Sequence, residues 1–111
     1  MTSKMRALSI RQPYAEQILR GQKKIEYRSR PTKIKERIYI YASLTLGDPY
    51  EFRKMKIQPG DLPTGLLVGT VEIADCTGSP GKYNWILKNP ERLQQGLKPK
   101  NHPQPVWFYP F

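Results

Sequence analysis

The chain has 111 residues, and its 19 Lys and Arg residues outnumber its nine Asp and Glu residues, which gives a net charge of +10. This length predicts one domain, residues 1–111, with a single modest core. The charge indicates a polyanionic partner, and the one cysteine, Cys76, excludes an intrachain disulfide and a multi-cysteine zinc site.

The chain begins with a predicted strand followed by a helix. Residues 6–10 have the pattern of a short strand. Pro13 and Gly21 are typical of the first turn and the end of a helix, which predicts a helix over residues 13–20.

Two strands with alternating side chains follow the helix. Residues 24–30 predict a strand that packs Ile25 and Tyr27 against the core. The opposite face of this strand is charged and carries Lys24, Glu26, Arg28 and Arg30. Residues 37–43 alternate in the same way, with one face formed by Ile38, Ile40 and Ala42 and the other by Arg37, Tyr39, Tyr41 and Ser43.

The second half of the chain is richer in turn-forming residues. Residues 46–64 predict a loop with about one helical turn, and residues 66–75 predict a long central strand. Residues 84–96 suggest a short helix or a pair of turns. Residues 98–105 hold three prolines and predict an extended surface arm, and residues 106–110 predict an aromatic strand. Together these elements predict a mostly β domain with one main helix, of the α+β class, closed or nearly closed into a barrel.

The sequence also limits the compartment and the chemistry. It contains no apolar stretch typical of a signal peptide or a membrane span, and we therefore expect a cytoplasmic protein without membrane contact. His102 is the one histidine, which excludes His-pair ribonuclease chemistry and a His-rich metal site. We expect no metal and no cofactor, and the sequence leaves the oligomeric state open.

A compact polar cluster is predicted where the helix meets the following strand. Gly21, Lys23, Glu26 and Arg28 have the spacing G-x-K-x-x-E-x-R, and the last two project from the same face of a strand. A carboxylate between two cations orients their donors toward a polar or phosphorylated ligand. The alternative is that Glu26 only neutralises a basic strand edge whose charges discourage edge-to-edge pairing.

Further polar residues are expected near this cluster. Ser9, Arg11 and Gln12 lie where the first strand ends and the helix begins, and a helix N-terminus offers free N–H groups to anions. Tyr41 and Ser43 lie on a strand face where aromatic rings alternate with cations, as base-stacking surfaces require. The alternative is core or barrel-wall packing, which we favour for at least one of Tyr39 and Tyr41. The candidate ligand-binding set is Ser9, Arg11, Gln12, Gly21, Lys23, Glu26, Arg28, Arg30, Tyr41 and Ser43.

The stretch "ALSIRQPYAEQILRGQKKIEYRSRP", followed by "RIYIYAS", resembles the ASCH domain (activating signal cointegrator 1 homology), a branch of the PUA-like superfamily. G-x-K-x-x-E-x-R is the signature of that family, and "VGTVEIADC" resembles its central strand. The resemblance implies a PUA-like pseudo-barrel with a cleft, between the barrel and the first helix, lined by the signature residues. It also implies an association with RNA, as a binding module or as an enzyme acting on modified or single-stranded RNA.

The resemblance extends to one bacterial ASCH group that is similar to N4-acetylcytidine amidohydrolases, whose catalytic set is a signature lysine, a threonine three residues later and a glutamate on a later strand. Lys23 and Glu72 match the first and third of these positions, but Glu26 occupies the position of the threonine. Lys23 and Glu26 offer an acid–base pair as another catalytic route.

Three functions therefore remain in consideration, and the sequence leaves open whether the protein is an enzyme. The leading interpretation is an RNA-binding ASCH domain whose polar cleft accepts a nucleotide or modified base. The second is an RNA-directed hydrolase, similar to the amidohydrolases or a ribonuclease, with Lys23, Glu26 and Glu72 as candidate catalytic residues. The third is a nonenzymatic module whose basic face binds an acidic protein.

Overall fold

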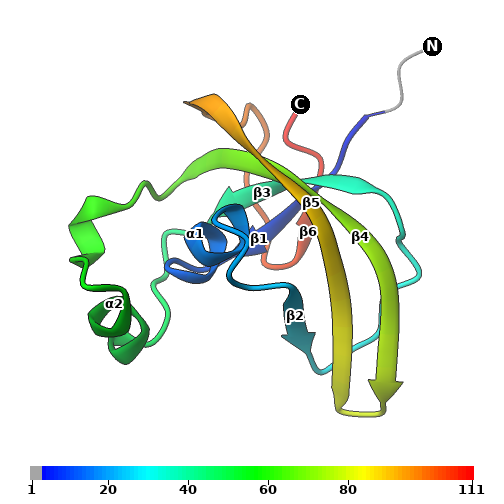
Figure 1. Cartoon of the computed structure of the whole chain (residues 1–111). Helices are drawn as coiled ribbons and strands as arrows, with labels where there is room; N and C mark the ends of the chain where they lie inside the picture. Colours follow the sequence, from blue (N-terminus) through cyan, green and yellow to red (C-terminus); the bar gives the residue numbers. More distant parts are fainter. Residues whose placement is uncertain (1–3) are drawn as a thin grey trace.

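The computed structural model describes residues 4–111. These residues form one six-stranded sheet, two α-helices and a short 3-10 helix (Figure 1). The elements are, in chain order, β1 (Ala7–Ile10), α1 (Tyr14–Leu19), β2 (Ile25–Arg28), β3 (Arg37–Ala42), α2 (Pro49–Met55), η1 (Pro59–Asp61), β4 (Leu66–Ser79), β5 (Lys82–Leu97) and β6 (Trp107–Phe108).

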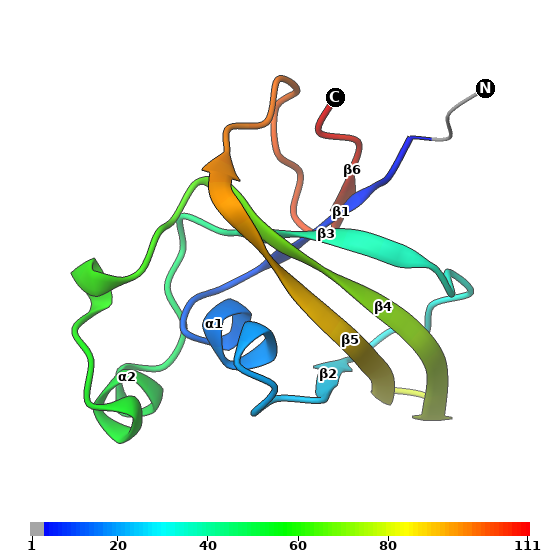
Figure 2. The ribbon, with the colours of Figure 1, turned by 45° about the horizontal axis from the view of Figure 1, so that its top comes forward.

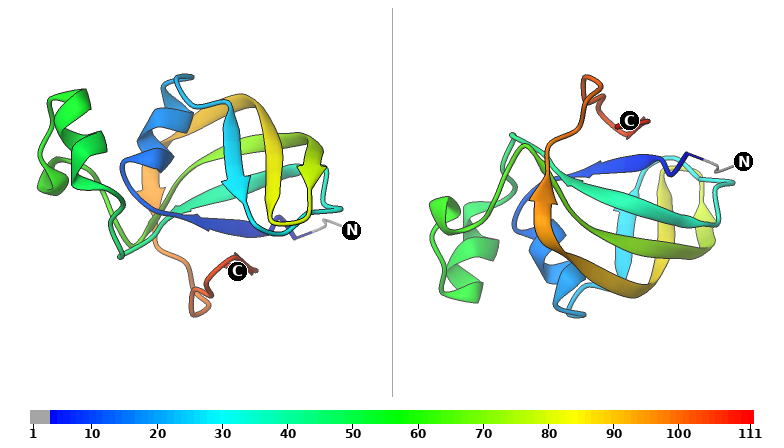
Figure 3. Two further views of the ribbon diagram at one scale, coloured as in Figure 1. Left: turned by 90° about the horizontal axis from the view of Figure 1, so that it is seen from below. Right: turned by 90° about the horizontal axis from the view of Figure 1, so that it is seen from above.

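The sheet has the strand order β2-β5-β4-β3-β1-β6 and curls into a pseudo-barrel (Figure 3). The pair β1–β3 is parallel, and the other neighbours are antiparallel. Figure 2 shows α1 inside the curve of the sheet, whereas α2 stands to one side. This arrangement confirms the predicted α+β class, a mostly β domain with one main helix packed on a barrel-like sheet.

The core fills the space between α1 and the concave side of the sheet. Ala15 and Ile18 of α1 pack with inward side chains of the strands, including Leu8, Ile40 and Val71, and all five are buried. Burial of apolar side chains is the main stabilising contribution to such a fold. The alternation predicted for residues 37–43 is confirmed on this inner face of β3.

A second, smaller cluster covers the outer face of the same strands. Tyr41 is 5% exposed and packs edge-on against Phe108, with ring centroids 5.3 Å apart, beside the buried Ala7 and Leu67. The C-terminal residues therefore cover the outside of β1 and β3. Only Trp107–Phe108 form a strand there, which is shorter than the one predicted over residues 106–110.

Residues 84–96 do not form the predicted helix or pair of turns. They belong to β5, which pairs along its first part with β2 and along its length with β4, so that strand pairing overrides the local sequence signals. Asn89 has a φ of 53°, and Pro90 follows it where the ladder to β4 is irregular. The ladder between β5 and β2 covers only residues 83–86 of β5, so Pro90 lies beyond it. The missing N–H of Pro90 therefore removes no hydrogen bond between β5 and β2.

Two other expectations need correction. In β2 the faces are the reverse of those predicted, because Glu26 is only 9% exposed whereas Tyr27 is 67% exposed. Glu26 is tolerated inside because cationic partners surround it. The segment 46–64 holds more helix than the one turn that was predicted, because it contains both α2 and η1. The side chain of Asp48 caps α2 by accepting a hydrogen bond from the Tyr50 N–H.

A partly buried ion pair joins α1 to the sheet, with the Glu16 carboxylate buried and the Arg92 side chain half-exposed. Arg92 of β5 donates to both carboxylate oxygens of Glu16 at 2.9 Å, and Arg20 donates at 2.7 Å. Burial raises the pKa of Glu16, but the hydrogen bonds from the two arginines outweigh it and lower the pKa overall.

The helices in residues 4–111 are too short to cross a lipid bilayer.

Candidate functional site

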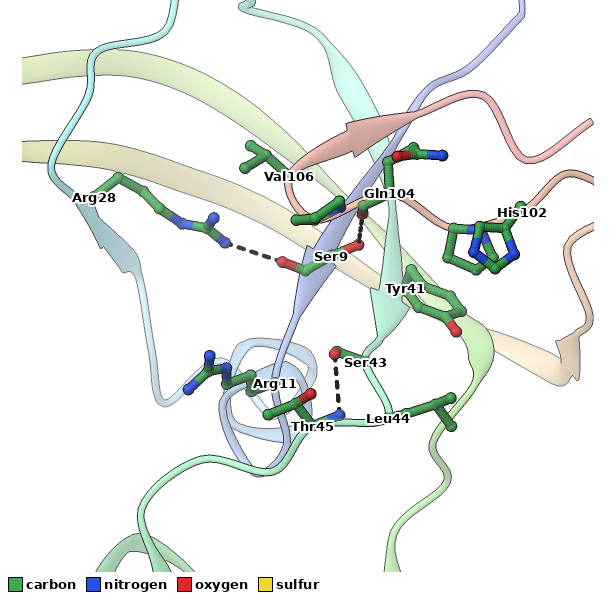
Figure 4. A pocket seen from close by; sticks show the side chains of 12 residues that line it. Ser9, Arg11, Arg28, Tyr41, Ser43, Leu44, Thr45, His102, Gln104 and Val106 are labelled. Atoms are coloured by element: carbon green, nitrogen blue, oxygen red, sulfur yellow. Dashed lines mark hydrogen bonds between the residues drawn. The ribbon is translucent and has the colours of Figure 1, made fainter.

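A cleft with both polar and apolar side chains in its lining lies where β1 and β3 end, facing the C-terminal arm (Figure 4). Its volume is about 460 Å³. Five residues of the predicted ligand-binding set line it, namely Ser9, Arg11, Arg28, Tyr41 and Ser43. Residues from three separate strands and the start of α1 thus meet at one place, because the sheet curls and brings β2 toward β1.

Arg28 connects β2 to β1 across this cleft. Its Nε and Nη2 atoms lie 2.9 and 2.8 Å from Oε2 of Glu26, and Nη2 also donates to the Ser9 carbonyl at 3.1 Å. The guanidinium carbon lies 5.5 Å from the centroid of the Trp85 ring. Because ionic, backbone and aromatic contacts all hold the guanidinium, its donors are fixed in position at the wall of the cleft.

Lys23 approaches the same carboxylate from the other side. Its Nζ atom lies 3.8 Å from Oε1 of Glu26, and it lies 5.5 Å and 5.0 Å from the ring centroids of Tyr14 and Tyr27. Lys23 lines a second hollow of about 460 Å³ between α1, β2 and the start of α2. The buried carboxylate therefore contacts Arg28, which lines the cleft, and Lys23, which lines the second hollow.

Gly21 and Gln12 lie outside the cleft and shape the helix. Gly21 has a φ of 75° directly after α1, a conformation that glycine adopts readily at a helix end. Gln12 is buried, and its side chain accepts from the Glu16 N–H at 3.0 Å and donates to the Pro63 carbonyl at 3.0 Å. These bonds hold the start of α1 in place.

Arg30 and Glu72 also lie away from the cleft. The carbonyl of Arg30 accepts a hydrogen bond from Trp85 Nε1 at 3.0 Å, and the residue is exposed. Glu72 lies on β4, beside Arg37 and Lys88 on the neighbouring strands. Its neighbours Val71 and Ile73 point into the core, so Glu72 projects from the outer face of β4, whereas Glu26 is buried.

One wall of the cleft comes from the arm that follows β5, which sequence reasoning did not place there. Ser9 donates through Oγ to the Gln104 carbonyl at 2.6 Å and through its N–H to the Val106 carbonyl at 2.9 Å. His102 lines the same wall. The signal for a stiff arm was present in the three prolines of residues 98–105, but nothing local indicated where the arm docks.

The groups around the cleft suit a polar, anionic ligand. Arg11 and Arg28 supply positive charge, and the hydroxyl of Ser43 supplies a donor and an acceptor. Tyr41 is too buried to offer its ring as a free stacking surface, and burial raises the pKa of its hydroxyl. Within residues 4–111, no three His, Cys, Asp or Glu side chains gather as metal ligands.

The curled sheet and the signature cluster define a PUA-like domain of the ASCH type. The ASCH domain profile matches residues 8–101, and the chain belongs to the ASCH domain family. Its relatives include activating signal cointegrator 1 of Homo sapiens and of Mus musculus, each 27% identical over 125 aligned residues. The alignment covers 90% of this chain and 21% of each relative, so the chain spans about a fifth of the length of these curated relatives.

Proposed function

We propose that this protein is an RNA-binding domain whose polar cleft accepts one nucleotide or modified base. Membership of the ASCH family supports an RNA-binding type of domain at a general level. The observation that carries the finer proposal is the position of Arg28, which the buried Glu26 and the Ser9 carbonyl hold at the cleft wall. A preorganised guanidinium binds a phosphate or a base edge without first losing side-chain freedom.

The size and composition of the cleft fit this ligand class. A volume of about 460 Å³ falls within the range of small-molecule sites. Arg11 and Arg28 provide charge-assisted donors for phosphate, whereas Ser43 and the arm provide hydrogen-bonding groups of the kind that read a base edge. The net charge of +10 adds attraction along the rest of an RNA strand.

We favour binding over hydrolysis as the function. One argument for this choice is that Glu72 projects from the outer face of β4, whereas the carboxylate of Glu26 is buried. Lys23 is also engaged between two tyrosine rings and the Glu26 carboxylate. Incubation with acetylated cytidine and with single-stranded RNA, followed by product analysis, tests this choice, and turnover of either compound would favour the hydrolase.

Calorimetric titration with nucleoside monophosphates and with single-stranded RNA tests the proposal. The variant Arg11→Met removes a donor from the cleft, and we expect about tenfold weaker nucleotide binding, equivalent to about 1.4 kcal/mol. Arg53→Met is the matched control, because it removes the same charge from an exposed residue of α2.

The same titrations distinguish the competing interpretations. RNA affinity should fall steeply as salt rises, because bound cations are released from the phosphates. Equal losses in Arg11→Met and Arg53→Met would show that only overall charge matters, as expected for a module that binds acidic proteins. Undetectable nucleotide binding at low ionic strength would refute the cleft as a nucleotide site.

A further inference from the structure

A basic hollow, separate from the cleft and from the hollow that Lys23 lines, lies at the opposite end of β1 from the cleft. It has a volume of about 530 Å³, and its lining includes Lys4, Arg6, Glu36, Arg37 and Tyr109. Three of these side chains are cationic, and Glu36 is the one acidic residue among those that line the hollow. Its local charge is therefore positive, as an anion-binding site requires.

The two arginines are held in different ways. Arg37 donates from Nη1 to Thr70 Oγ1 and from Nη2 to the Asn89 carbonyl, both at 2.8 Å. These partners are neutral, so they fix the guanidinium without cancelling its charge, and the nearest carboxylate, on the exposed side chain of Glu91, is 3.9 Å away. Arg37 is thus an immobilised charge at the rim of the hollow.

Arg6 has hydrogen-bonding capacity that its protein neighbours do not satisfy. Its Nε atom is buried and has no hydrogen-bond partner, although Oε2 of Glu36 lies 3.3 Å away without the alignment of a hydrogen bond. Its guanidinium carbon lies 5.4 Å from the Tyr109 ring centroid, which orients the group. Because the Arg6 side chain is 29% exposed although Nε is buried, its accessible part can face an anion in the hollow.

The position of this hollow relates it to the cleft. Arg6 and Ser9 are three residues apart, about 10 Å along an extended chain, and Val106 and Tyr109 of the antiparallel C-terminal segment are spaced in the same way. Ser9 and Val106 line the cleft, and Arg6 and Tyr109 line the basic hollow. One extended strand of nucleic acid is long enough to contact both.

We propose that this hollow is a phosphate-binding subsite, in which Arg6, Arg37 and Lys4 hold the backbone phosphate of a nucleotide that neighbours the one in the cleft. The proposal rests on the proposed function for the identity of its ligand. It assigns the two sites different roles, since the cleft recognises a nucleotide and the basic hollow fixes the path of the strand without reading sequence.

The test compares ligands of different length in the intact protein. Arg6→Met should leave nucleoside monophosphate binding unchanged, because that ligand fills only the cleft. It should weaken a single-stranded oligonucleotide about three- to tenfold and reduce the slope of log affinity against log salt by about 0.7. Arg53→Met is again the charge-matched control. Lys4→Met, at an exposed residue before β1, replaces Arg6→Met if that variant does not fold.

A direct probe separates this proposal from the proposed function. Titration of isotope-labelled protein with inorganic phosphate should shift the amide resonances of Arg6 and Tyr109, and these shifts should disappear in Arg6→Met. If they appear but no RNA binds, the subsite stands and the RNA-binding function fails. The subsite is refuted if the oligonucleotide affinity of Arg6→Met equals that of Arg53→Met, or if mononucleotide and oligonucleotide weaken equally. It is also refuted as an RNA subsite if only a phosphopeptide occupies it.

Discussion

Replacement of Glu26 by Gln tests the centre of the site. The carboxylate accepts two close contacts from Arg28, at 2.8 and 2.9 Å, and attracts Lys23 at 3.8 Å. An amide keeps the shape but loses the charge, and it presents either one oxygen or a competing N–H to Arg28. A buried hydrogen bond to a charged group contributes about 1.5–3 kcal/mol, and two cations lose their counter-charge. We therefore expect a loss of about 2–3 kcal/mol in the free energy of unfolding.

This loss corresponds to a melting temperature about 10 °C lower in a domain of this size. Thermal unfolding followed by circular dichroism measures it, and calorimetry should show at least tenfold weaker mononucleotide binding, because Arg28 is no longer held at the cleft. Glu91→Gln makes the same change in net charge at an exposed side chain and should alter stability by at most about 0.5 kcal/mol. If Glu26→Gln and Glu91→Gln melt at the same temperature and bind alike, the Glu26 carboxylate does not hold Arg28 in place and the reasoning fails.

Two further predictions concern the join between α1 and the sheet. The folded-state pKa of Glu16 is lowered below its ordinary value of 4.5, so its ion pair contributes stability that is complete above pH 4.5 and is lost as pH falls through the folded-state pKa. Melting temperatures measured across this acidic range should therefore fall less steeply in Glu16→Gln than in the parent, and parallel curves would contradict this. In Gly69→Ala the new methyl group would meet Leu19 Cδ2 and, at 2.6 Å, the Glu91 carbonyl, and overpacking should cost about 1–3 kcal/mol in urea denaturation. An unchanged denaturation midpoint would show that α1 moves aside freely.

The sequence predicted best what depends on neighbouring residues. The alternation of apolar and polar side chains identified β3, and the helix-start and helix-end signals of Pro13 and Gly21 identified α1, because both kinds of signal are local. Residues 84–96 were assigned wrongly because Asn89 and Pro90 interrupt the pattern, and only pairing with distant strands decides the outcome.

The site residues also divide into those that local sequence signals could predict and those that depend on contacts between distant parts of the chain. Ser9, Arg11 and Arg28 could be grouped from sequence, since chain ends of adjacent elements and a signature spacing point to them. The arm could not be placed, because the bond from Ser9 to Gln104 joins residues 95 positions apart. The inward direction of Glu26 also depended on such contacts, because alternation gives two faces without saying which one is buried.

The barrel is closed between β2 and β1 by side chains rather than by strand pairing. Arg28 of β2 reaches the Ser9 carbonyl of β1, and next to this contact Trp85 of β5 stacks on Trp107 of β6 with centroids 5.8 Å apart. The other strand boundaries are backbone ladders. Local opening of a domain follows the boundary with the fewest backbone hydrogen bonds, and here that boundary borders the cleft. Under the proposed function, a nucleotide in contact with both Arg28 and Arg11 would span this boundary. Occupancy of the cleft and closure of the barrel would then be thermodynamically linked, and a bound RNA strand would suppress the opening of the domain at this boundary.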